Sequence, residues 1–560
     1  MARERPTQVA VVAGEGHDRS GQVIYRRLSF AELDRVSDRY AWGLRAYGIA
    51  PGTRVLSMVP AGLPLISLTF ALLKLGAVPV LIDPAMGRRN LAQCIAECAP
   101  EAMIGVPRAQ LAALVFRGAF RSVRRRVNVG SRFVPLGDVN LADLSVPLNT
   151  PYPLEPLAAD APAAIIFTTG STGVPKGVLY EHGMFEAQVR QLRALFAIEP
   201  GEVEMPAFPL FALFNVALGC TSAIPPIDPT RPAACDPAAV VAFINAQGVT
   251  STFGSPAIWR KVTAHCLERG IQLPTLRRVL MAGAPVPADL HERFRQILSP
   301  EADTHTPYGA TEALPVSSIS GREVLAAIAE RQQGRAAPDP LAGTCVGWPA
   351  PEVTLRIIPV SDEPIARWDD SLALPPNQIG EICVRGPSVT KTYVGRPEAT
   401  TLAKIPDGDQ VWHRMGDLGY LDDQGRLWFY GRKSQRVETP EGTLYTEPVE
   451  LLFNQHPQVA RSALVGIPTG RDGPGAGTDP GRGRYREPVL VVEPSDRAIL
   501  RDRAARERLI GELRSMGART PMTAKIARIL LHPSLPVDIR HNAKIFREIL
   551  AVWASQQLKG

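Results

Sequence analysis

The spacing of apolar and polar positions predicts alternating helices and strands in the first part of the chain. Ser29 and Glu32 have the spacing of a capping box, and we expect their helix to continue through Tyr40 and Leu44. Apolar runs of strand length lie at 53–59, 77–83, 163–170, 249–254 and 276–283. Strands that alternate with helices predict a mostly parallel sheet covered on both faces.

The pattern changes after about residue 350 to short strands separated by turn residues, as in "GEICVRG" and "GRLWFYGR". From Pro448 onward helices and strands alternate again, so we place a boundary near Ser434. The predicted fold is α/β. A large domain (1–433) contains parallel-sheet α/β subdomains and a β-rich subdomain, and a small α+β domain (434–560) follows. Within the small domain, residues 468–486 are dense in Gly, Pro, Arg and Asp and predict a mobile loop.

Composition is that of a folded protein with more than one core. The chain has 560 residues, 45% hydrophobic and 21% charged, which excludes a disordered or collagen-like class. The formal net charge is +7. The local arginine cluster comprises Arg117, Arg121, Arg124, Arg125 and Arg126. No aromatic residues interleave with it, so we expect no nucleic-acid partner and favour a solvated surface over an anionic partner or membrane.

The cysteines and the most apolar segment indicate an intracellular location. Seven cysteines form an odd set, and Cys94 and Cys98 lie one helical turn apart with no second ligand pair, which favours buried reduced thiols over a metal site. The apolar run 62–82 is interrupted by Pro64, Lys74 and Pro79, so we expect a buried helix and strand rather than a membrane span. The first 14 residues have no signal-peptide pattern. A cytoplasmic protein without a transmembrane segment is predicted.

The strongest chemical signal is the string "TTGSTGVPKG" at 168–177, directly after the apolar run 163–167. Ligands of open α/β sheets bind at the carboxyl ends of strands. Hydroxyls and backbone amides freed by glycine can surround phosphate oxygens, and a lysine adds positive charge. The spacing differs from that of the common P-loop. The predicted phosphate-binding residues are Thr168, Thr169, Gly170, Ser171, Thr172, Gly173 and Lys176.

This string resembles the phosphate loop of the superfamily that contains acyl- and aryl-CoA ligases, adenylation domains of nonribosomal peptide synthesis and luciferases. Further strings resemble motifs of that superfamily in the expected order, over nearly the whole chain. They are "MAGAPV" (281–286), "YGATE" (308–312), "RMGDLGY" (414–420), "GRKSQRVE" (431–438) and "NAKIFR" (542–547). The resemblance implies an enzyme that uses ATP and Mg²⁺ to convert a carboxylic acid into an acyl-AMP.

The resemblance also implies roles for individual residues. Gly283, Ala284 and Pro285 lie along the adenine, and Tyr308 stacks on it; Gly309 and Ala310 of the same motif are further nucleotide-binding residues. Thr311 touches phosphate, Glu312 and Thr168 hold Mg²⁺, Asp417 accepts from the ribose hydroxyls and Arg432 reaches nucleotide oxygens. Lys544 and Glu312 are the implied catalytic residues. The small domain is implied to rotate about a hinge at Ser434 between two half-reactions, with Lys544 serving the first.

The sequence departs from the common CoA-ligase pattern around the second half-reaction. Glu441 stands where many ligases have glycine, and Ser434 where aspartate or lysine is usual. Ala212 replaces a common histidine, and "NAK" (542–544) replaces SGK. Together with the run 167–189, these features resemble the β-lactone synthetases of bacterial olefin biosynthesis. That resemblance implies adenylation of a long-chain 2-alkyl-3-hydroxy acid, followed by attack of its own 3-hydroxyl to close a β-lactone.

Rival interpretations stay open at this point. A long-chain acyl-CoA or acyl-ACP ligase shares the first half-reaction, and a module that holds ATP without catalysis is the alternative from another class. Apolar residues beside the motifs predict an acyl pocket formed by Phe208, Phe211, Phe214 and Leu314. His182 and His305 are interpreted as structural, and no base for the hydroxyl is assigned. The expected partner is the small-molecule acid, and the resemblance implies assembly with other olefin-pathway enzymes.

Overall fold

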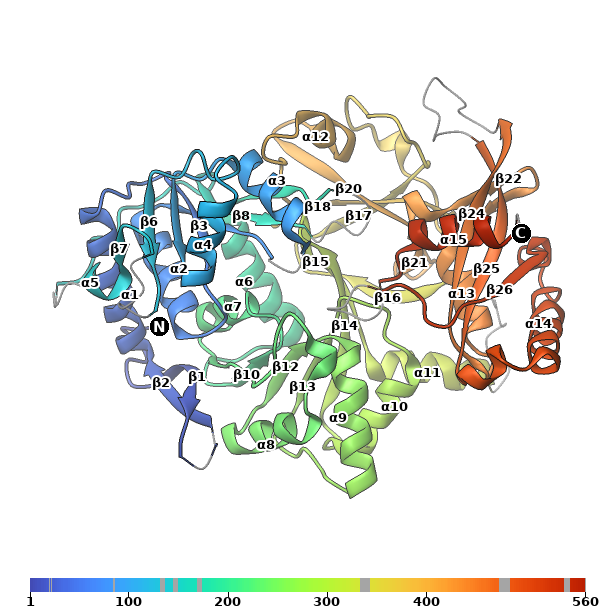
Figure 1. Cartoon of the computed structure of the whole chain (residues 1–560), viewed down its shortest axis with the longest axis horizontal. Coiled ribbons are helices and arrows are strands. Elements are labelled where there is room, and N and C mark those ends of the chain that lie inside the picture. Colours follow the sequence, from blue (N-terminus) through green and yellow to red (C-terminus); the bar gives the residue numbers. More distant parts are fainter. Residues whose placement is uncertain are drawn as a thin grey trace.

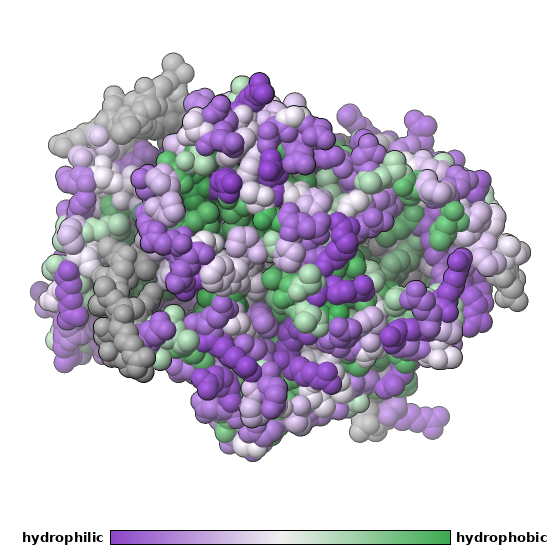
Figure 2. Space-filling model, turned by 180° about the vertical axis from the view of Figure 1, so that it is seen from behind, coloured by the Kyte–Doolittle hydropathy of each residue, from purple (hydrophilic) through white to green (hydrophobic). Residues whose placement is uncertain are grey.

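A computed structural model describes residues 1–558 except 20, 22, 84–85, 131–135, 145–149, 169–173, 333–342, 473–483 and 538–543. The chain forms two large sheets with their helices and a smaller C-terminal unit, which lies on the right in Figure 1. Seen from behind, the surface is largely hydrophilic, and hydrophobic residues show mainly in hollows (Figure 2).

The first large sheet is mostly parallel, as the sequence predicted. Its order is β7 (Val139–Asn140), β6 (Arg125–Asn128), β5 (Ala102–Gly105), β3 (Arg54–Met58), β4 (Val78–Leu81), β8 (Pro162–Phe167) and β9 (Gly177–Glu181). Only β9 pairs antiparallel, with β8. The cores on its two faces bury α1 (Phe30–Ala46) and α2 (Leu63–Leu75) on one side. They bury α3 (Arg88–Cys98) and α4 (Pro107–Val115) on the other. The short α5 (Leu141–Leu144) lies against α1.

The second sheet begins with a largely parallel run. Its order is β14 (Asp303–Ala310), β13 (Arg278–Met281), β12 (Ser251–Gly254), β10 (Val203–Pro206), β11 (Thr221–Ala223), β1 (Val9–His17) and the antiparallel edge strand β2 (Val23–Ser29). One face packs on α8 (Pro237–Gln247), α9 (Pro256–Arg269) and α10 (Ala288–Ile297). The other face packs on α6 (His182–Phe196) and α7 (Phe211–Leu218). Because α2 and α7 share a core with β1, they join the two sheets.

The same sheet continues as an antiparallel run, which is the β-rich part expected after residue 350. Its strands are β15 (Ala313–Ser320), β16 (Thr344–Pro349), β21 (Leu427–Arg432), β20 (Gln410–Leu421), β18 (Gly380–Arg385) and β17 (Thr354–Ile358), with β19 (Lys404–Asp407) beside β20. The helices are α11 (Gly321–Gln332) and α12 (Pro397–Ala403). The predicted fold class is therefore confirmed in both of its parts.

The C-terminal unit contains a hairpin, a three-stranded sheet and helices. The hairpin is β22 (Val437–Thr439) and β23 (Gly442–Leu444), and the sheet is β24 (Val459–Asp472), β25 (Arg484–Pro494) and β26 (Arg528–Leu531). The helices are α13 (Thr446–Phe453), α14 (Arg503–Gly517) and α15 (Arg547–Gln557). The short 3₁₀ turn 433–435 precedes this unit. The boundary near Ser434 stays a prediction.

Two sequence expectations about local structure have clear outcomes. The capping box is confirmed, because Ser29 Oγ accepts from the Glu32 amide and Glu32 Oε2 accepts from the Ser29 amide at 2.7 Å. The loop predicted over 468–486 is wrong at both ends. Pro468 pairs with Arg486 and Asp472 with Arg484, because backbone pairing between β24 and β25 outweighs the turn-rich composition there. Residues 473–483 of that predicted loop lie outside the described residues.

The predicted buried helix and strand over 62–82 are confirmed as α2 and β4. No helix in the described part of the chain has the length and apolarity that crossing a bilayer requires. All seven cysteines are free thiols, and only Cys345 is not buried.

Candidate functional site

The parallel strands of the second sheet bring the residues predicted for the adenine to one edge. The carboxyl ends of β14, β13, β12 and β10 meet there, since these strands are parallel neighbours. The segment 283–285 follows β13 directly, and Tyr308 lies near the end of β14. Gly283 has φ +88°, a left-handed conformation that favours glycine at this turn. The adenine residues predicted from two separate motifs are therefore neighbours.

Asp417 is the centre of a compact polar cluster at this edge. Its strand β20 pairs with β21, and Asp417 stands opposite Arg432 in the register. Arg432 lies 3.1 Å from Asp417 Oδ1, and the Tyr308 hydroxyl donates to Asp417 Oδ2 at 2.5 Å. Burial raises the pKa of Asp417, while the Arg432 charge and the Tyr308 hydroxyl oppose this shift. The Asp417 charge in turn raises the pKa of Arg432.

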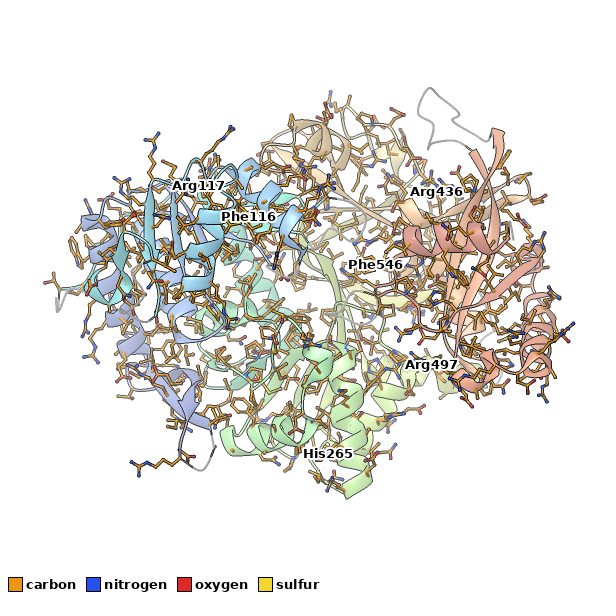
Figure 3. The ribbon with its side chains drawn as sticks, in the orientation of Figure 1. Phe116, Arg117, His265, Arg436, Arg497 and Phe546 are labelled. Atoms are coloured by element: carbon orange, nitrogen blue, oxygen red, sulfur yellow. The ribbon has the colours of Figure 1, made fainter. Side chains whose placement is uncertain are left out.

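Lys544 lies in the C-terminal unit, and its charge acts on Asp417 of this cluster. The positive charge of this half-buried lysine is among those that lower the pKa of Asp417. Phe546, two residues further on, lies near the middle of the molecule, where the C-terminal unit faces the large sheet (Figure 3). An electrostatic effect of Lys544 on Asp417 thus links the C-terminal unit to the predicted nucleotide residues.

Glu312 lies in a second cluster beside the first. The Tyr393 hydroxyl donates to Glu312 Oε1 at 2.7 Å, and Lys176 Nζ stands 4.8 Å from the centre of the Tyr393 ring. Burial and the Glu312 charge raise the pKa of Tyr393. Lys404 is buried and bonds to Thr390, and burial lowers the pKa of Lys404 to about 7 against the opposing charge of Glu312. Two lysines and one carboxylate therefore share a largely desolvated space.

The phosphate loop is described only at its two ends. Thr168 and Lys176 close it, because the Thr168 amide donates to the Lys176 carbonyl at 3.0 Å and the Lys176 amide to Thr168 Oγ1 at 3.1 Å. Burial lowers the pKa of Lys176, and Glu312 opposes this. The predicted residues Thr169, Gly170, Ser171, Thr172 and Gly173 lie outside the described residues.

The donors near Glu312 fit a hard divalent cation. Mg²⁺ takes few protein ligands, typically one or two carboxylates with phosphate and water oxygens. Glu312 supplies the carboxylate of such a set, and Thr168 adds a hydroxyl at the start of the phosphate loop. Among the described residues no group of three or more His, Cys, Asp or Glu side chains could hold a metal by itself. A cation here would therefore depend on the phosphates of the nucleotide.

Three of the four residues predicted for an acyl pocket belong to a continuous series of aromatic rings. Phe211 stacks on Phe253 with ring centres 3.9 Å apart and lies 6.0 Å from Phe214. The ring centres of Phe214 and Phe185 are 6.0 Å apart, and Phe185 stacks on Tyr180 with ring centres 4.9 Å apart.

Both ends of this series connect to other predicted residues. Phe208 lies 5.5 Å from Phe253. The Tyr180 hydroxyl donates to the Thr311 carbonyl at 2.5 Å. The carbonyl of Leu314, the fourth predicted pocket residue, accepts from Gln188 of α6 at 2.9 Å. The apolar series thus ends at the nucleotide motif.

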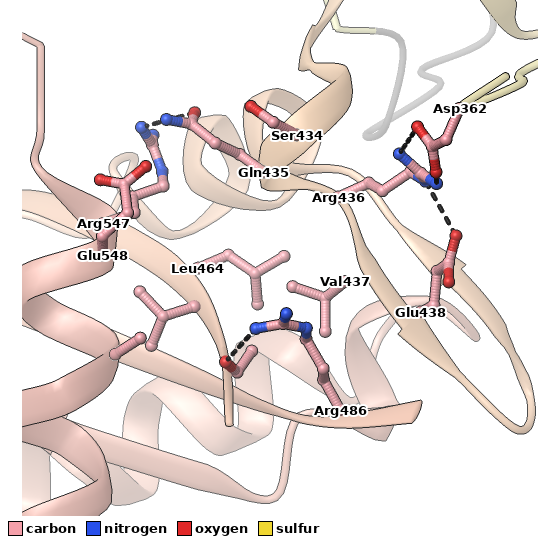
Figure 4. Close-up of a pocket in the computed structure, with 13 residues that line it drawn as sticks. Asp362, Ser434, Gln435, Arg436, Val437, Glu438, Leu464, Arg486, Arg547 and Glu548 are labelled. Carbon is pink, nitrogen blue, oxygen red and sulfur yellow. Dashed lines mark hydrogen bonds and ion pairs between the residues drawn. The ribbon is translucent and has the colours of Figure 1, made fainter. Parts of the chain in front are cut away.

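The predicted hinge lies beside a cavity of about 320 Å³. Ser434 and Gln435 line it from the hinge, and Arg547 of α15 donates to the Gln435 side chain at 3.1 Å (Figure 4). Arg436 bonds to Asp362 at 2.6 Å and to Glu438 at 2.9 Å. These contacts connect the hinge to the units on both of its sides.

Several residues of the site carried no signal in the sequence analysis. Tyr393 is 81 residues from the Glu312 it bonds, and Lys404 and Thr390 lie in segments without a motif. Their proximity depends on backbone pairing of Val178 with Tyr393, which brings the 390–394 segment to β9. By contrast His305 packs its ring against Phe196 at 5.5 Å, and burial lowers its pKa to about 4, which fits the structural interpretation.

Comparisons with known proteins give a consistent picture. Residues 1–394 match the family described as AMP-binding enzyme. An olefin β-lactone synthetase of Xanthomonas campestris is 47% identical over 100% of this chain and 96% of its own. A second, from Stenotrophomonas maltophilia, is 46% identical over 100% and 97%. A feruloyl-CoA synthase of Amycolatopsis is 31% identical over 80% and 82%.

Solved structures match the fold over the whole chain. An amide bond synthetase, McbA, of Marinactinospora thermotolerans has a TM-score of 0.74 at 24% identity, covering 98% of this chain and 97% of its own. ATP-bound MatB of Rhodopseudomonas palustris has a TM-score of 0.74 at 21% identity, covering 99% and 98%. At these identities the likeness concerns the fold alone.

Proposed function

The chain belongs to the family of AMP-binding enzymes, and on that premise we propose that it is an ATP-dependent adenylate-forming ligase that makes a β-lactone. The proposed substrate is a long-chain 2-alkyl-3-hydroxy fatty acid, and the products are the lactone, AMP and pyrophosphate. One observation carries the adenylation step: Tyr308, Asp417 and Arg432 of the large unit share an electrostatic cluster with Lys544 of the C-terminal unit. The full-length identity of 47% to an olefin β-lactone synthetase supports the second step.

In the first step, a substrate carboxylate oxygen attacks the α-phosphorus of ATP and pyrophosphate leaves. Negative charge then spreads over the phosphoryl and bridging oxygens, and cations that are already positioned lower this barrier. Lys544 is the proposed cation at the attacking and bridging oxygens, and Arg432 and Lys176 are proposed at the nucleotide phosphates. Mg²⁺, when bound through Glu312 and Thr168, would shield charge on the triphosphate.

Nucleotide orientation is proposed to depend on Tyr308 and Asp417. Asp417 is buried between two donors, so its oxygens are held at a fixed position before a ribose arrives. Carboxylates accept two hydroxyl donors readily. The Tyr308 ring is also fixed, because its hydroxyl bonds to Asp417 and its ring lies 6.0 Å from that of Phe429. This bond therefore holds in place the two side chains that are proposed to bind adenine and ribose.

In the second step, the 3-hydroxyl oxygen of the acyl-AMP attacks its own carbonyl carbon. A C–O bond closes the four-membered ring, the bond from the acyl carbon to the AMP oxygen breaks so that AMP leaves, and the hydroxyl proton passes to water. Nucleophile and electrophile are in one molecule, so orientation replaces a bimolecular encounter. The aromatic series from Phe253 to Tyr180 is the proposed surface that holds the alkyl chain, since it is apolar and ends at Thr311.

The deciding experiment is incubation of the purified protein with a long-chain 2-alkyl-3-hydroxy acid, ATP and Mg²⁺, with and without CoA. The product is identified by NMR at room temperature. A β-lactone and AMP formed without CoA are expected. An acyl-CoA that forms only with CoA would instead establish the alternative, a long-chain acyl-CoA or acyl-ACP ligase.

The alternative ligase is favoured by the 31% identity to a feruloyl-CoA synthase. It is disfavoured by the hinge region. Glu441 is exposed at the β22–β23 turn, where its carbonyl accepts from Lys525 at 2.5 Å. Glu441 thus places a side chain at this turn, where the usual glycine of the thiol channel has none.

Two further proposals concern the location of the protein in the cell and its partner enzymes. We propose that the protein works in the cytoplasm, which its reduced cysteines support. Assembly with other enzymes of an olefin pathway is proposed from the relatives alone. Co-purification from cells that express such a pathway would test it, and a lone protein of monomer size would contradict it.

A further inference from the structure

An exposed apolar surface lies at the end of α4, in the first sheet's helical layer. Leu111, Leu114, Val115 and Phe116 are 54%, 38%, 69% and 36% exposed. Leu111, Leu114 and Val115 are spaced i, i+3 and i+4, so they share one helical face. The opposite face of α4 is buried at Ala109, Gln110 and Ala113. We call these four residues the α4 patch.

Exposed arginines flank the α4 patch along the chain. Arg108 lies three residues before Leu111 on the same helical face, and Arg117 and Arg121 follow Phe116; all three are exposed. Figure 3 shows Phe116 and Arg117 beside each other. Across a shallow depression, α3 contributes Ala92 and, one turn earlier, the exposed pair Arg88 and Arg89.

These arginines have no acidic partner among the described residues. Arg117 donates only to the Leu114 carbonyl at 3.2 Å. Glu97, the acid of α3, is bound by Arg396 at 2.6 Å. By contrast Arg125 donates to the Tyr47 carbonyl and Arg126 lies 3.7 Å from Asp138. Arg125 and Arg126 of the cluster seen in the sequence are therefore structural, whereas Arg117 and Arg121, which follow the α4 patch, have no acidic partner among the described residues.

We propose that the α4 patch and its arginines bind the surface of an anionic phospholipid bilayer. Lipid phosphates match the unpaired guanidinium groups, and the interfacial acyl region matches the apolar side chains, which is the combination that peripheral binding requires. Arginine also binds phosphate by two parallel hydrogen bonds.

The position of the patch connects it to the reaction. Helix α3 holds Arg396 through Glu97, and Tyr393, three residues before Arg396, bonds to Glu312. The bilayer surface would thus lie one helix away from the site. If the proposed function is right, the long-chain acid and the lactone both partition into lipid, so binding there shortens the path of substrate and product.

Vesicle co-sedimentation without ATP or acid tests the proposal independently of the proposed function. The protein is mixed with phosphatidylcholine vesicles that either contain or lack phosphatidylglycerol, at low and at high salt. Binding is expected only with phosphatidylglycerol and is expected to weaken with salt. The double variant R117Q/R121Q should bind about fivefold more weakly for each arginine lost. The double variant V115S/F116S should lose about tenfold in binding.

Matched controls come from exposed residues elsewhere. Ile24→Ser removes an apolar side chain that is 51% exposed on β2, and Arg503→Gln removes an exposed arginine of α14. Both are expected to bind like the wild type, and all variants should keep its melting temperature. Absent wild-type binding, equal binding to neutral vesicles, or unchanged binding of both double variants would overturn the proposal. If the double variants change the oligomeric state of the protein but not its binding to vesicles, the patch is a protein interface instead.

Discussion

At the residue scale, the polar groups of the site act through a few short bonds that join distant segments. Asp417 takes one bond from Tyr308, 109 residues away in sequence, and an ion pair from its cross-strand neighbour Arg432. Glu312 takes its bond from Tyr393. Hydrogen bonds to charged groups in buried surroundings are about twice as strong as neutral ones, so these contacts define positions rather than merely add stability.

Lys544→Ala is expected to reduce adenylate formation by about a hundredfold or more, because it removes a cation from the transition state. Folding should be intact, since the side chain is only half buried. Pyrophosphate release measures the effect, and the melting temperature is the folding control. Lys525→Ala, in the same unit but bonded to the Glu441 carbonyl, should leave adenylation unchanged. Wild-type pyrophosphate release from Lys544→Ala would remove this residue from the reaction.

Glu312→Gln is expected to raise the Mg²⁺ concentration needed for half-maximal adenylation by about tenfold, because a neutral amide is a weaker ligand for a hard cation. The bond from Tyr393 can persist to the amide oxygen, so the fold should be kept. A Mg²⁺ titration of pyrophosphate release measures this. Glu398→Gln, an exposed change on α12, serves as the control. Identical titrations for the wild type and Glu312→Gln would place the cation elsewhere.

At the scale of helices and strands, the sequence predicted an element wherever the apolar positions followed one clear spacing. The capping box at Ser29 and the strands β3, β4, β8, β12 and β13 are confirmed, because apolar runs of that length bury well in a parallel sheet. Extension of β24 and β25 into 468–486 was missed, since cross-strand pairing is not visible in local composition. Tyr393 and Lys404 were missed for the same reason: the position of Tyr393 depends on pairing with the distant Val178, and that of Lys404 on pairing of β19 with β20.

The variant Phe211→Ala, on α7, tests whether the aromatic series binds the alkyl chain of the substrate. The ring stacks on Phe253 at 3.9 Å, so its loss removes apolar contact area from the proposed chain-binding surface. We expect the KM for a long-chain 3-hydroxy acid to rise about tenfold, while the KM for a short-chain acid changes little. Steady-state AMP release on both acids measures the ratio. An equal rise for both would indicate a general loss of structure at α7 instead.

At the scale of the whole molecule, the C-terminal unit is held against the large sheet by a buried contact. Thr344 of β16 donates its hydroxyl to Glu447 Oε1 of α13 at 2.5 Å, and Glu447 is 8% exposed. Burial raises the pKa of Glu447 to about 7. If the small domain rotates about Ser434, this contact must break. Burial thus favours the protonated carboxyl, whereas the bond from Thr344 and the Arg547 charge favour the charged form.

Glu447→Gln is expected to stabilise the protein, and the effect should grow with pH. Below about pH 4.5 the carboxyl is protonated in both folded and unfolded chains, so the variant gains nothing there. Between about pH 4.5 and 7 the Glu447 carboxyl is deprotonated in the unfolded chain but still protonated in the folded one. The free energy of unfolding of the wild type therefore falls as the pH rises, whereas that of Glu447→Gln does not change through this residue. Above pH 7 the difference in the free energy of unfolding between Glu447→Gln and the wild type should level off at up to about 3 kcal/mol. Melting temperatures of both proteins across this range measure it, with the exposed change Glu507→Gln on α14 as control. A constant difference at every pH would mean that Glu447 does not titrate in this window and does not make the docking of the C-terminal unit depend on pH.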